Sequence, residues 1–360
     1  MSRGVKKFGI LTSGGDAPGL NSAIRAVCRT AMLQYGMQPI GIRNGYRGLA
    51  EGNFFELTES DVSGILTRGG TILGTSREKP FKNPEPDAET GLYPVDLIKQ
   101  NYEKWELDAL VCLGGNGTNT TASLLAKEGL NVVGLPKTID NDIVKTDVTF
   151  GFHTALDVAT EAVDRIHSTA HSHSRIMVIE VMGHKAGWLG LYSGVAGGAD
   201  VILLPEIPYD IDSVAQCVMK RRDAGKEFSI VVVAEGALSK DEALLQKKEL
   251  KRRRKLMPYS IAYRVAHELE EATGLVSRVT VLGYLQRGGT PSPYDRVLAT
   301  QFGAAGAHFL AEEKFGNLVA LQNNKIVPVP LEEIAGKVKN IPSDNPMITT
   351  GRCLGICFGD

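Results

Sequence analysis

Two carboxylates set two residues apart mark the chemically richest stretch of the chain, residues 136–142. Asp140 and Asp142 follow Lys137 and Thr138 in this stretch. A carboxylate can accept a proton from a hydroxyl, its oxygens can bind a divalent cation, and a lysine ammonium neutralises phosphate. The alternative is a simple turn after an apolar strand, although such turns do not normally gather two acids and a cation. The pattern therefore favours phosphoryl transfer assisted by a metal ion.

Three glycine-rich segments follow short apolar runs elsewhere in the chain, at residues 13–19, 68–77 and 114–118. Exposed backbone N–H groups at such turns can bind phosphate. Each segment alone is weak evidence, because a tight turn between a strand and a helix uses the same residues. The segment at residues 13–19 matches neither the P-loop nor the dinucleotide fingerprint, which argues against a dehydrogenase. Arg77 could neutralise a bound anion there or be an ordinary surface arginine.

These residues need elements that bring strand ends together, and the apolar runs predict them. Short runs of buried type alternate with helical patterns, such as residues 21–35, 120–128 and 154–170. The seven runs are residues 7–12, 109–113, 132–135, 175–181, 201–204, 228–234 and 279–282. Such alternation predicts parallel sheets covered on both faces, with ligands beyond the carboxyl ends of the strands. We therefore expect an α/β protein with two Rossmann-like three-layer domains, whose mainly parallel sheets face a shared active-site cleft.

Length and composition narrow the class of protein. The 360 residues are 43% hydrophobic and 22% charged, as expected for a globular protein with two sizeable cores. The net charge of −1 gives no general attraction to nucleic acid or to an anionic membrane. No apolar run reaches membrane-spanning length and no signal peptide is evident, so we expect a cytoplasmic protein whose five cysteines are free thiols.

Six sequence blocks, taken together and in order, resemble the phosphofructokinase family. The resemblance extends from about residue 7 to residue 303. Only the Thr-Ile-Asp-Asn-Asp block is specific by itself, whereas the joint order of the blocks is very specific. The blocks are residues 13–19, 68–71, 114–118, 138–142, 182–183 and 286–289.

The resemblance implies transfer of a phosphoryl group from ATP to the 1-hydroxyl of fructose 6-phosphate, giving fructose 1,6-bisphosphate in glycolysis. Asp140 would be the general base, Thr138 would contact the transferred group, and Asp142 would help to hold Mg²⁺. We expect residues 1–151 and about 287–336 to form the ATP domain. Residues 152–286 and about 337–360 would form the fructose 6-phosphate domain.

The matching positions also imply two sets of binding residues and a shared site. The donor set is Gly15, Arg77, Gly114, Gly115, Asn116, Gly117, Thr118 and Lys137, with Asn116 and Asp142 as metal ligands. The sugar-phosphate set is Thr138, Asp140, Arg175, Met182, Gly183, His184, Glu235, Arg278, Tyr284 and Arg287. In relatives the counterparts of Arg175 and Arg278 reach a neighbouring subunit, so we expect a homo-oligomer, either a dimer or a tetramer. Taken singly, any of these arginines could be a salt-bridge residue, and Glu235 could end a solvated turn.

Two positions bear on the identity of the phosphoryl donor. ATP users of the family typically carry glycine at both, and pyrophosphate users carry aspartate and lysine, whereas this chain has Gly117 and Lys137. This mixture resembles the third group of the family, which is related to the pyrophosphate enzymes but able to use ATP. A carboxylate at position 117 would repel the α-phosphate of a nucleotide, while an added lysine need not exclude ATP. We therefore predict ATP as the donor and keep pyrophosphate as the alternative.

Other departures from the family pattern affect the metal and the sugar phosphate. Asn116 stands where most relatives have an acid, so either the affinity for the metal falls or Asp142 contributes more to binding it. His184 replaces a common arginine, which weakens the phosphate site unless Lys185 substitutes. Tyr284 replaces a histidine, as it does in pyrophosphate-type relatives.

The usual effector site of bacterial relatives is only partly matched. Arg25 and Arg29 agree with it, but Glu59 and Ala224 replace basic residues. A carboxylate would repel a diphosphate at this place, so we expect the usual effector response to be weak or absent.

Several other interpretations fit part of the pattern. A related NAD or lipid kinase would share the Gly-Gly-x-Gly-Thr loop but not the 138–142 and 286–289 blocks, and a non-catalytic sensor would not need Asp140 as a base. The basic residues 247–255 could bind nucleic acid, although a solvated helix face fits better because no aromatic residues accompany them. His167 and His171 have metal-ligand spacing, but without a third ligand a helix end is the better interpretation.

Overall fold

The computed structural model describes residues 4–82, 84–256 and 259–360 of the chain. The chain divides into two compact units. The first unit comprises Met1–Ile139, Ile143–Thr154 and Arg287–Val338. The second comprises Asp140–Asp142, Ala155–Gln286 and Lys339–Asp360. The division therefore assigns the segment with both carboxylates to the second unit, although Thr138 belongs to the first.

A seven-stranded sheet, in the order β11-β10-β5-β4-β1-β2-β3, forms the centre of the first unit. All of its neighbouring pairs are parallel except for β2 with β3 and β10 with β11, which form antiparallel edges. The strands are β1 Lys7–Thr12, β2 Gln38–Ile42, β3 Phe54–Glu56, β4 Ala109–Gly114, β5 Val132–Pro136, β10 Asn317–Gln322 and β11 Lys325–Pro330. The helices are α1 Leu20–Tyr35, α2 Gly45–Glu51, α3 Pro94–Lys104, α4 Asn116–Lys127, α11 Pro293–Ala311 and α12 Leu331–Ile334.

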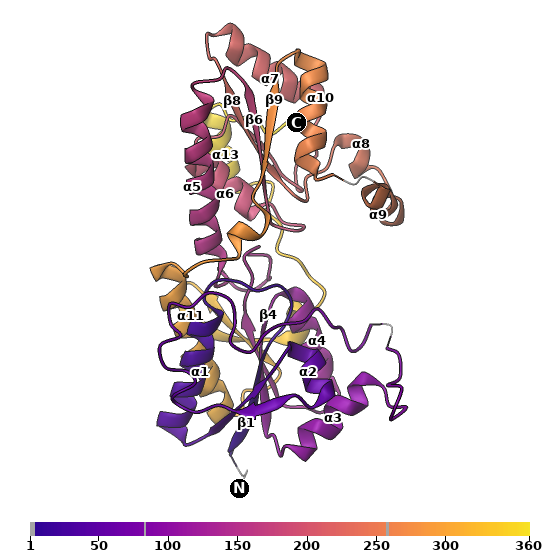
Figure 1. Ribbon diagram of the computed structural model, residues 1–360, viewed down its shortest axis with the longest axis vertical. Coiled ribbons are helices and arrows are strands. Elements are labelled where there is room, and N and C mark those ends of the chain that lie inside the picture. Colours follow the sequence, from indigo (N-terminus) through magenta and orange to yellow (C-terminus); the bar gives the residue numbers. More distant parts are fainter. Residues whose placement is uncertain (1–3, 83, 257–258) are drawn as a thin grey trace. The chain divides into compact units, whose positions relative to one another are not determined.

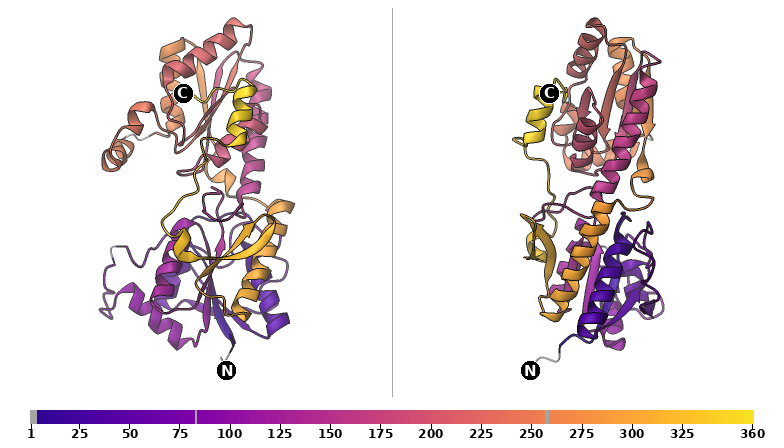
Figure 2. Two further views of the ribbon diagram at one scale, coloured as in Figure 1. Left: turned by 180° about the vertical axis from the view of Figure 1, so that it is seen from behind. Right: turned by 90° about the vertical axis from the view of Figure 1, so that its left-hand side faces the viewer.

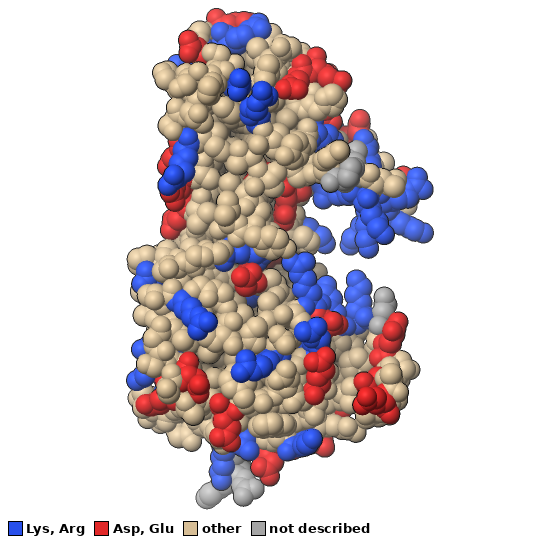
Figure 3. Space-filling view, in the orientation of Figure 1, with Lys and Arg blue, Asp and Glu red and all other residues tan. Residues whose placement is uncertain are grey.

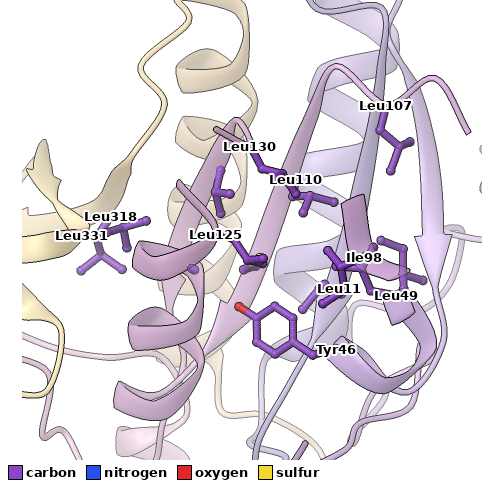
Figure 4. Packing of buried hydrophobic residues seen from close by; sticks show 14 of the residues in the cluster. Leu11, Tyr46, Leu49, Ile98, Leu107, Leu110, Leu125, Leu130, Leu318 and Leu331 are labelled. Carbon is purple, nitrogen blue, oxygen red and sulfur yellow. The ribbon is translucent and has the colours of Figure 1, made fainter. Parts of the chain in front are cut away.

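Helices cover both faces of this sheet. Figure 1 shows α1 and α11 packed together on one face, with α2, α3 and α4 on the other. The central strands are apolar on both faces; β4, for example, is buried along its whole length. Figure 4 shows part of one core cluster, in which Leu11 and Leu110 of the sheet lie near Tyr46 of α2 and Leu125 of α4. The buried strands hold the loops that follow them in fixed positions.

A four-stranded, fully parallel sheet forms the centre of the second unit, in the order β7-β8-β6-β9. Its strands are β6 Ile176–Val181, β7 Val201–Leu203, β8 Ser229–Ala234 and β9 Ser277–Val281. Its helices are α5 Phe152–Ala170, which begins at the end of the first unit, α6 Trp188–Ala196, α7 Ile211–Asp223, α8 Lys240–Ala243, α9 Lys247–Leu256, α10 Ile261–Thr273, the 3-10 helix η1 Gly283–Gln286 and α13 Pro346–Cys353.

The core of the second unit joins this sheet to two helices. Val214 and Val218 of α7 and Val265 and Leu269 of α10 pack with buried residues of β6, β7 and β8. The yellow helix α13 packs against α6 (Figure 2). In the described part of the chain, no helix is long and apolar enough to span a lipid bilayer.

The sequence predicted the fold class correctly, as two sets of mainly parallel strands alternating with helices. All seven apolar runs are strands, namely β1, β4, β5, β6, β7, β8 and β9. Strands β2, β3, β10 and β11 were not predicted. The start of the helix after β4 was placed wrongly, at Thr120, because Gly117 was read as part of a loop. The helix begins at Asn116, with Gly115 as its N-cap.

Candidate functional site

In the first unit, three neighbouring parallel strands end side by side and carry the predicted polar segments. Strands β1, β4 and β5 are adjacent in the sheet, and residues 13–16, 115–118 and 137–138 follow them. The N–H of Ser13 donates to the carbonyl of Leu113 (3.1 Å), and the N–H of Lys137 donates to Gly114 (3.1 Å). We call residues 13–16, 74–79, 114–118 and 137–138 the glycine-loop site.

The loop after β1 is held in place by a second segment from far along the chain. The N–H of Gly14 donates to the carbonyl of Ser76 (2.9 Å), and the hydroxyl of Thr75 donates to the carbonyl of Gly14 (2.6 Å). Gly14 has a φ of 85°, which favours glycine because a Cβ would be strained there. Arg77 follows Ser76 directly and is exposed to solvent. The structure thus places Arg77 in a segment that is hydrogen-bonded to the glycine loop.

The first turn of α4 forms the second part of the glycine-loop site. The hydroxyl of Thr118 donates to the carbonyl of Ser13 (3.1 Å), which joins this turn to the first loop. The leading N–H groups of a helix have no partners inside the helix and attract anions. A Cβ added at Gly117 would lie 3.8 Å from Cε and 4.0 Å from Nζ of Lys79. The ammonium of Lys79 therefore lies beside the start of α4, where it would favour an anion.

Lys137 is almost completely buried, with 3% of its surface exposed. Its ammonium donates to the backbone carbonyl of Ser13 (3.3 Å) and to that of Gly15. A buried cation needs such partners, because burying a charge without them costs on the order of several kcal/mol. Lys137 is thus a structural support of the glycine loop as well as a positive charge beside it.

Arg287 is placed beside the glycine loop of the same unit. Its Nη1 donates to the carbonyl of Asp16 (2.7 Å). A Cβ added at Gly15 would lie 2.6 Å from that Nη1, so the guanidinium lies close against Gly15. The arginine predicted for the sugar phosphate therefore borders the segment predicted for the donor.

The turn that carries the carboxylate pair has a constrained backbone. Asn141, between the two acids, has a φ of 50°, in the left-handed region. The N–H of Lys339 donates to the carbonyl of Asp142 (2.7 Å), and its ammonium donates to Oδ1 of Asn141 (3.2 Å). Asp142 is 5% exposed, whereas Asp140 is only partly buried. Lys339, from the C-terminal part of the chain, thus contacts both the backbone and a side chain of this turn.

In the second unit, three adjacent parallel strands likewise end together. Strands β8, β6 and β9 are neighbours, and residues 235–237, 182–184 and 282–286 follow them. Oε1 of Glu235 accepts the N–H of His184 (2.7 Å), and the N–H of Glu235 donates to Val181 (2.9 Å). Gly183 has a φ of 141°, so the sharp turn before His184 favours glycine. We call these residues the Glu235 site.

Gln286 and Tyr284, in the segment after β9, also belong to the Glu235 site. Oε1 of Gln286, which is fully buried, accepts the N–H of Met182 (3.3 Å). Tyr284 is 73% exposed, so its ring is available to a ligand or to another subunit. Burial raises the pKa of Glu180 above its ordinary value, and the charge of Glu235 adds to this effect. Glu180 lies one residue before the end of β6 and accepts the N–H of Ala262 (3.0 Å).

The structure does not bring Arg175 and Arg278 to the Glu235 site of their own unit. Arg175 directly precedes β6, and Arg278 is the second residue of β9, paired in register with Met177. Met182 follows the opposite end of β6, so about seven residues of extended chain, roughly 20 Å, separate it from Arg175. Both arginines therefore lie at the amino-terminal ends of strands whose carboxyl-terminal ends carry the other sugar-phosphate candidates.

Sequence reasoning missed the residues that support the site. The Thr75 hydroxyl and the Ser76 carbonyl hydrogen-bond to the backbone of Gly14. The N–H of Lys339 donates to Asp142, and Lys79 lies close to Gly117. Lys79 had one available signal, since it is a cation two residues after Arg77 in a glycine-rich segment.

His167 and His171, at the end of α5, both contact the ring of Phe228 edge-on. In the described ranges, no group of three or more His, Cys, Asp or Glu could hold a metal ion.

Comparison with known proteins gives a consistent match over most of the chain. The family model described as Phosphofructokinase matches residues 7–310. A protein of Spirochaeta thermophila named ATP-dependent 6-phosphofructokinase is 62% identical over 360 residues, which are 99% of this chain and 98% of that protein. A Propionibacterium freudenreichii protein of the same name is 53% identical over 372 residues, 98% of this chain and 99% of that protein.

A solved structure agrees with the fold. The crystal structure of Pichia pastoris phosphofructokinase in the T-state matches with a TM-score of 0.79 and 38% sequence identity. The match covers 92% of this chain but only 35% of the Pichia chain. The present chain thus corresponds to about a third of that longer protein and to nearly all of the two bacterial relatives.

Proposed function

Because the chain belongs to the phosphofructokinase family, we propose that it transfers the γ-phosphoryl group of ATP to the 1-hydroxyl of D-fructose 6-phosphate. The product would be fructose 1,6-bisphosphate, and the reaction is a step of glycolysis, which takes place in the cytoplasm. The observation that carries the proposal is the position of Asp140 and Asp142 in the segment that follows β5. Strand β4, which neighbours β5, and strand β1, which neighbours β4, lead into the glycine loops. Phosphoryl transfer depends mainly on such positioning and on neutralisation of charge.

In the proposed reaction Asp140 accepts the proton of the sugar hydroxyl, and Thr138 contacts the transferred phosphoryl group. Mg²⁺ would neutralise charge on the donor phosphates. The residues present suit this ion, because Asp142 offers carboxylate oxygens and Asn116 an amide oxygen, while Mg²⁺ usually keeps several waters and phosphate oxygens as ligands. Of these two side chains only Asp142 is charged, so the protein alone would bind Mg²⁺ weakly. We therefore propose that the metal enters together with its nucleotide.

The donor would bind at the glycine-loop site of the first unit. Gly15, Gly114, Gly115, Gly117 and Thr118 would offer backbone or hydroxyl groups to phosphate, and Arg77, Lys79 and Lys137 would supply positive charge. We assign the first unit to the donor and the second to the sugar phosphate. Gly117 favours ATP, because its open space would accommodate the α-phosphate. Lys137 is the observation that favours pyrophosphate as an alternative, although its hydrogen bonds to the glycine loop give it a role with either donor.

Replacing Lys137 by methionine is expected to raise the KM for ATP by about tenfold, the effect of losing one charge-assisted hydrogen bond. Methionine keeps the length of the side chain but leaves the carbonyls of Ser13 and Gly15 without the ammonium. Steady-state kinetics measure the KM for ATP, and thermal unfolding measures the effect of the lost hydrogen bonds on stability. Lys127→Met, at the exposed end of α4, is the control and should change neither quantity. An unchanged KM for ATP in Lys137→Met would contradict a role in the donor site.

Fructose 6-phosphate would meet Met182, Gly183, His184, Glu235 and Tyr284 in the second unit, with Arg287 near its phosphate. Arg175 and Arg278 would serve the site of a neighbouring subunit in a homodimer or homotetramer. Their position at the amino-terminal ends of β6 and β9 supports this proposal, since they are far from Met182 along the strands. Arginine suits a phosphate dianion because its guanidinium can form paired hydrogen bonds.

Mixed oligomers test the sharing of the site between subunits. Asp140→Asn and Arg175→Ala should each be nearly inactive alone. When the two chains are co-expressed with different tags and purified through both, activity should return to about half of the wild-type value, because one of the two sites in a dimer is complete. The Asp140→Asn chain paired with Glu235→Ala is the control. It should stay inactive if Asp140 and Glu235 serve the same subunit's site.

The donor and the reaction are tested together in one assay. Fructose 1,6-bisphosphate is measured from fructose 6-phosphate and Mg²⁺ with ATP, ADP or pyrophosphate as separate donors. Turnover with ATP is expected. Turnover with pyrophosphate alone would replace the assigned donor, and no turnover with any donor would reject the proposed reaction.

A further inference from the structure

Helix α9 consists almost entirely of charged residues and has no buried face. Seven of its ten residues are lysine or arginine, and none of the ten is buried. Figure 3 shows these basic side chains gathered on α9. A helix in a globular protein usually owes its stability to an apolar face that packs on a core. Polar contacts must therefore contribute to holding α9 beside its unit.

Arg254 provides such a contact. Its Nη2 donates to the backbone carbonyls of Gly236 (3.2 Å) and Ala237 (3.0 Å). These residues directly follow Glu235 at the end of β8. Hydrogen bonds from a guanidinium are stronger than those between neutral groups, so the contact can fix a turn of the backbone.

The turn held by Arg254 is tightly confined on its other side. A Cβ added at Gly236 would collide with the carbonyl oxygen of His184. The N–H of His184 in turn donates to Oε1 of Glu235 (2.7 Å). Arg254 thus contacts the backbone of residues 236–237, and His184 contacts the carboxylate of the residue just before them.

Glu235 and Arg254 also border a cavity of about 270 Å³ within the second unit. Its lining includes Glu180, Glu235, Glu242 and two cations, Arg254 and Arg264. Arg264 is committed to Glu242 through two hydrogen bonds of 2.6 and 2.8 Å, and Glu242 is 1% exposed. Arg254 is therefore the lining cation that is directed at the backbone behind Glu235.

We propose that Arg254 is a positioning residue for Glu235, and that α9 is a basic arm whose attachment orders the fructose 6-phosphate site. This inference rests on the proposed function, in which Glu235 meets hydroxyl groups of the sugar. Arg254 acts through the turn at residues 235–237 and does not itself touch the substrate. It is thus a determinant of affinity for the sugar phosphate and has no role toward the donor.

Arg254→Met, which keeps the aliphatic chain but removes both hydrogen bonds, tests the proposal against Arg252→Met on the same helix. Both variants lose one positive charge, so general electrostatic attraction affects them equally. We expect Arg254→Met to raise the KM for fructose 6-phosphate by about tenfold, the typical effect of losing a charge-assisted hydrogen bond, while the KM for ATP stays within about twofold. Arg254→Lys should recover most of the loss, because lysine can donate to the same carbonyls. Equal effects in Arg252→Met and Arg254→Met, or no effect in either, would overturn the proposal.

Amide hydrogen exchange supplies a second readout that needs no activity. The N–H of Ala237 donates to Ala234 (2.9 Å) within the turn, and Arg254→Met should speed exchange there while α10 stays protected. Unchanged exchange would overturn the positioning role. If the wild-type protein does not phosphorylate fructose 6-phosphate, the proposed reaction fails, and the exchange result alone then decides whether Arg254 holds the turn.

Discussion

Replacing Asp140 by asparagine is expected to lower kcat for fructose 6-phosphate phosphorylation by about 10³- to 10⁴-fold, the upper range for loss of a general base. The amide has nearly the same shape as the carboxylate but cannot accept the hydroxyl proton. Because Asp140 is only partly buried, the fold should tolerate the change, and the thermal midpoint should stay within about 2 °C. The KM values for both substrates should change much less than kcat. Steady-state kinetics with ATP and Mg²⁺ measure the split.

The control for this prediction is Asp157→Asn, which removes an exposed carboxylate on α5. It should keep full activity, which excludes a general effect of removing one negative charge. Asp140 would not be the base if Asp140→Asn retained a tenth or more of the wild-type rate. Loss of activity together with a large fall in thermal stability would instead indicate that Asp140 supports the fold.

Replacing Gly117 by aspartate is expected to lower kcat/KM for ATP by about 100-fold or more, while the protein becomes slightly more stable. A carboxylate near 4 Å from the α-phosphate would be repelled by about 4 kcal/mol at an effective dielectric constant of 20. The fold has room for the change, since the new Cβ would meet nothing closer than Lys79 Cε at 3.8 Å. An acid in the first turn of α4, which has none, should also stabilise the helix by about 0.3–1 kcal/mol. Donor kinetics and thermal unfolding test the two opposite effects.

Gly117→Ala separates the effect of charge from that of size. It adds a Cβ without a charge, so most of the activity with ATP should remain. Turnover with pyrophosphate should rise in Gly117→Asp, because pyrophosphate has no α-phosphate or nucleoside at this place, and Lys137 is already present. Full activity of Gly117→Asp with ATP would show that the nucleotide does not pass beside the start of α4.

The sequence was most informative where function depends on local pattern. Apolar runs predicted every strand that leads into the two sites. Strands β4 and β6, for example, are buried along their whole length, and a strand buried on both faces is mostly apolar. It was least informative at the edges of the first sheet. Strand β3 has no buried residue and β11 alternates Lys325 and Pro328 with apolar residues, so neither gives a clear apolar run.

The sequence by itself determined the family and the fold class, because the order of short motifs along a chain needs no coordinates. Tertiary structure alone decided what several charged side chains do. Lys137 donates to carbonyls more than a hundred residues earlier, Arg287 lies over Gly15, and Arg254 holds the turn behind Glu235. The physical reason is that a hydrogen bond joins groups that are close in space, and the separation of those groups is set by how whole strands and helices pack. A sequence pattern can supply a cation, but only the fold gives it a partner.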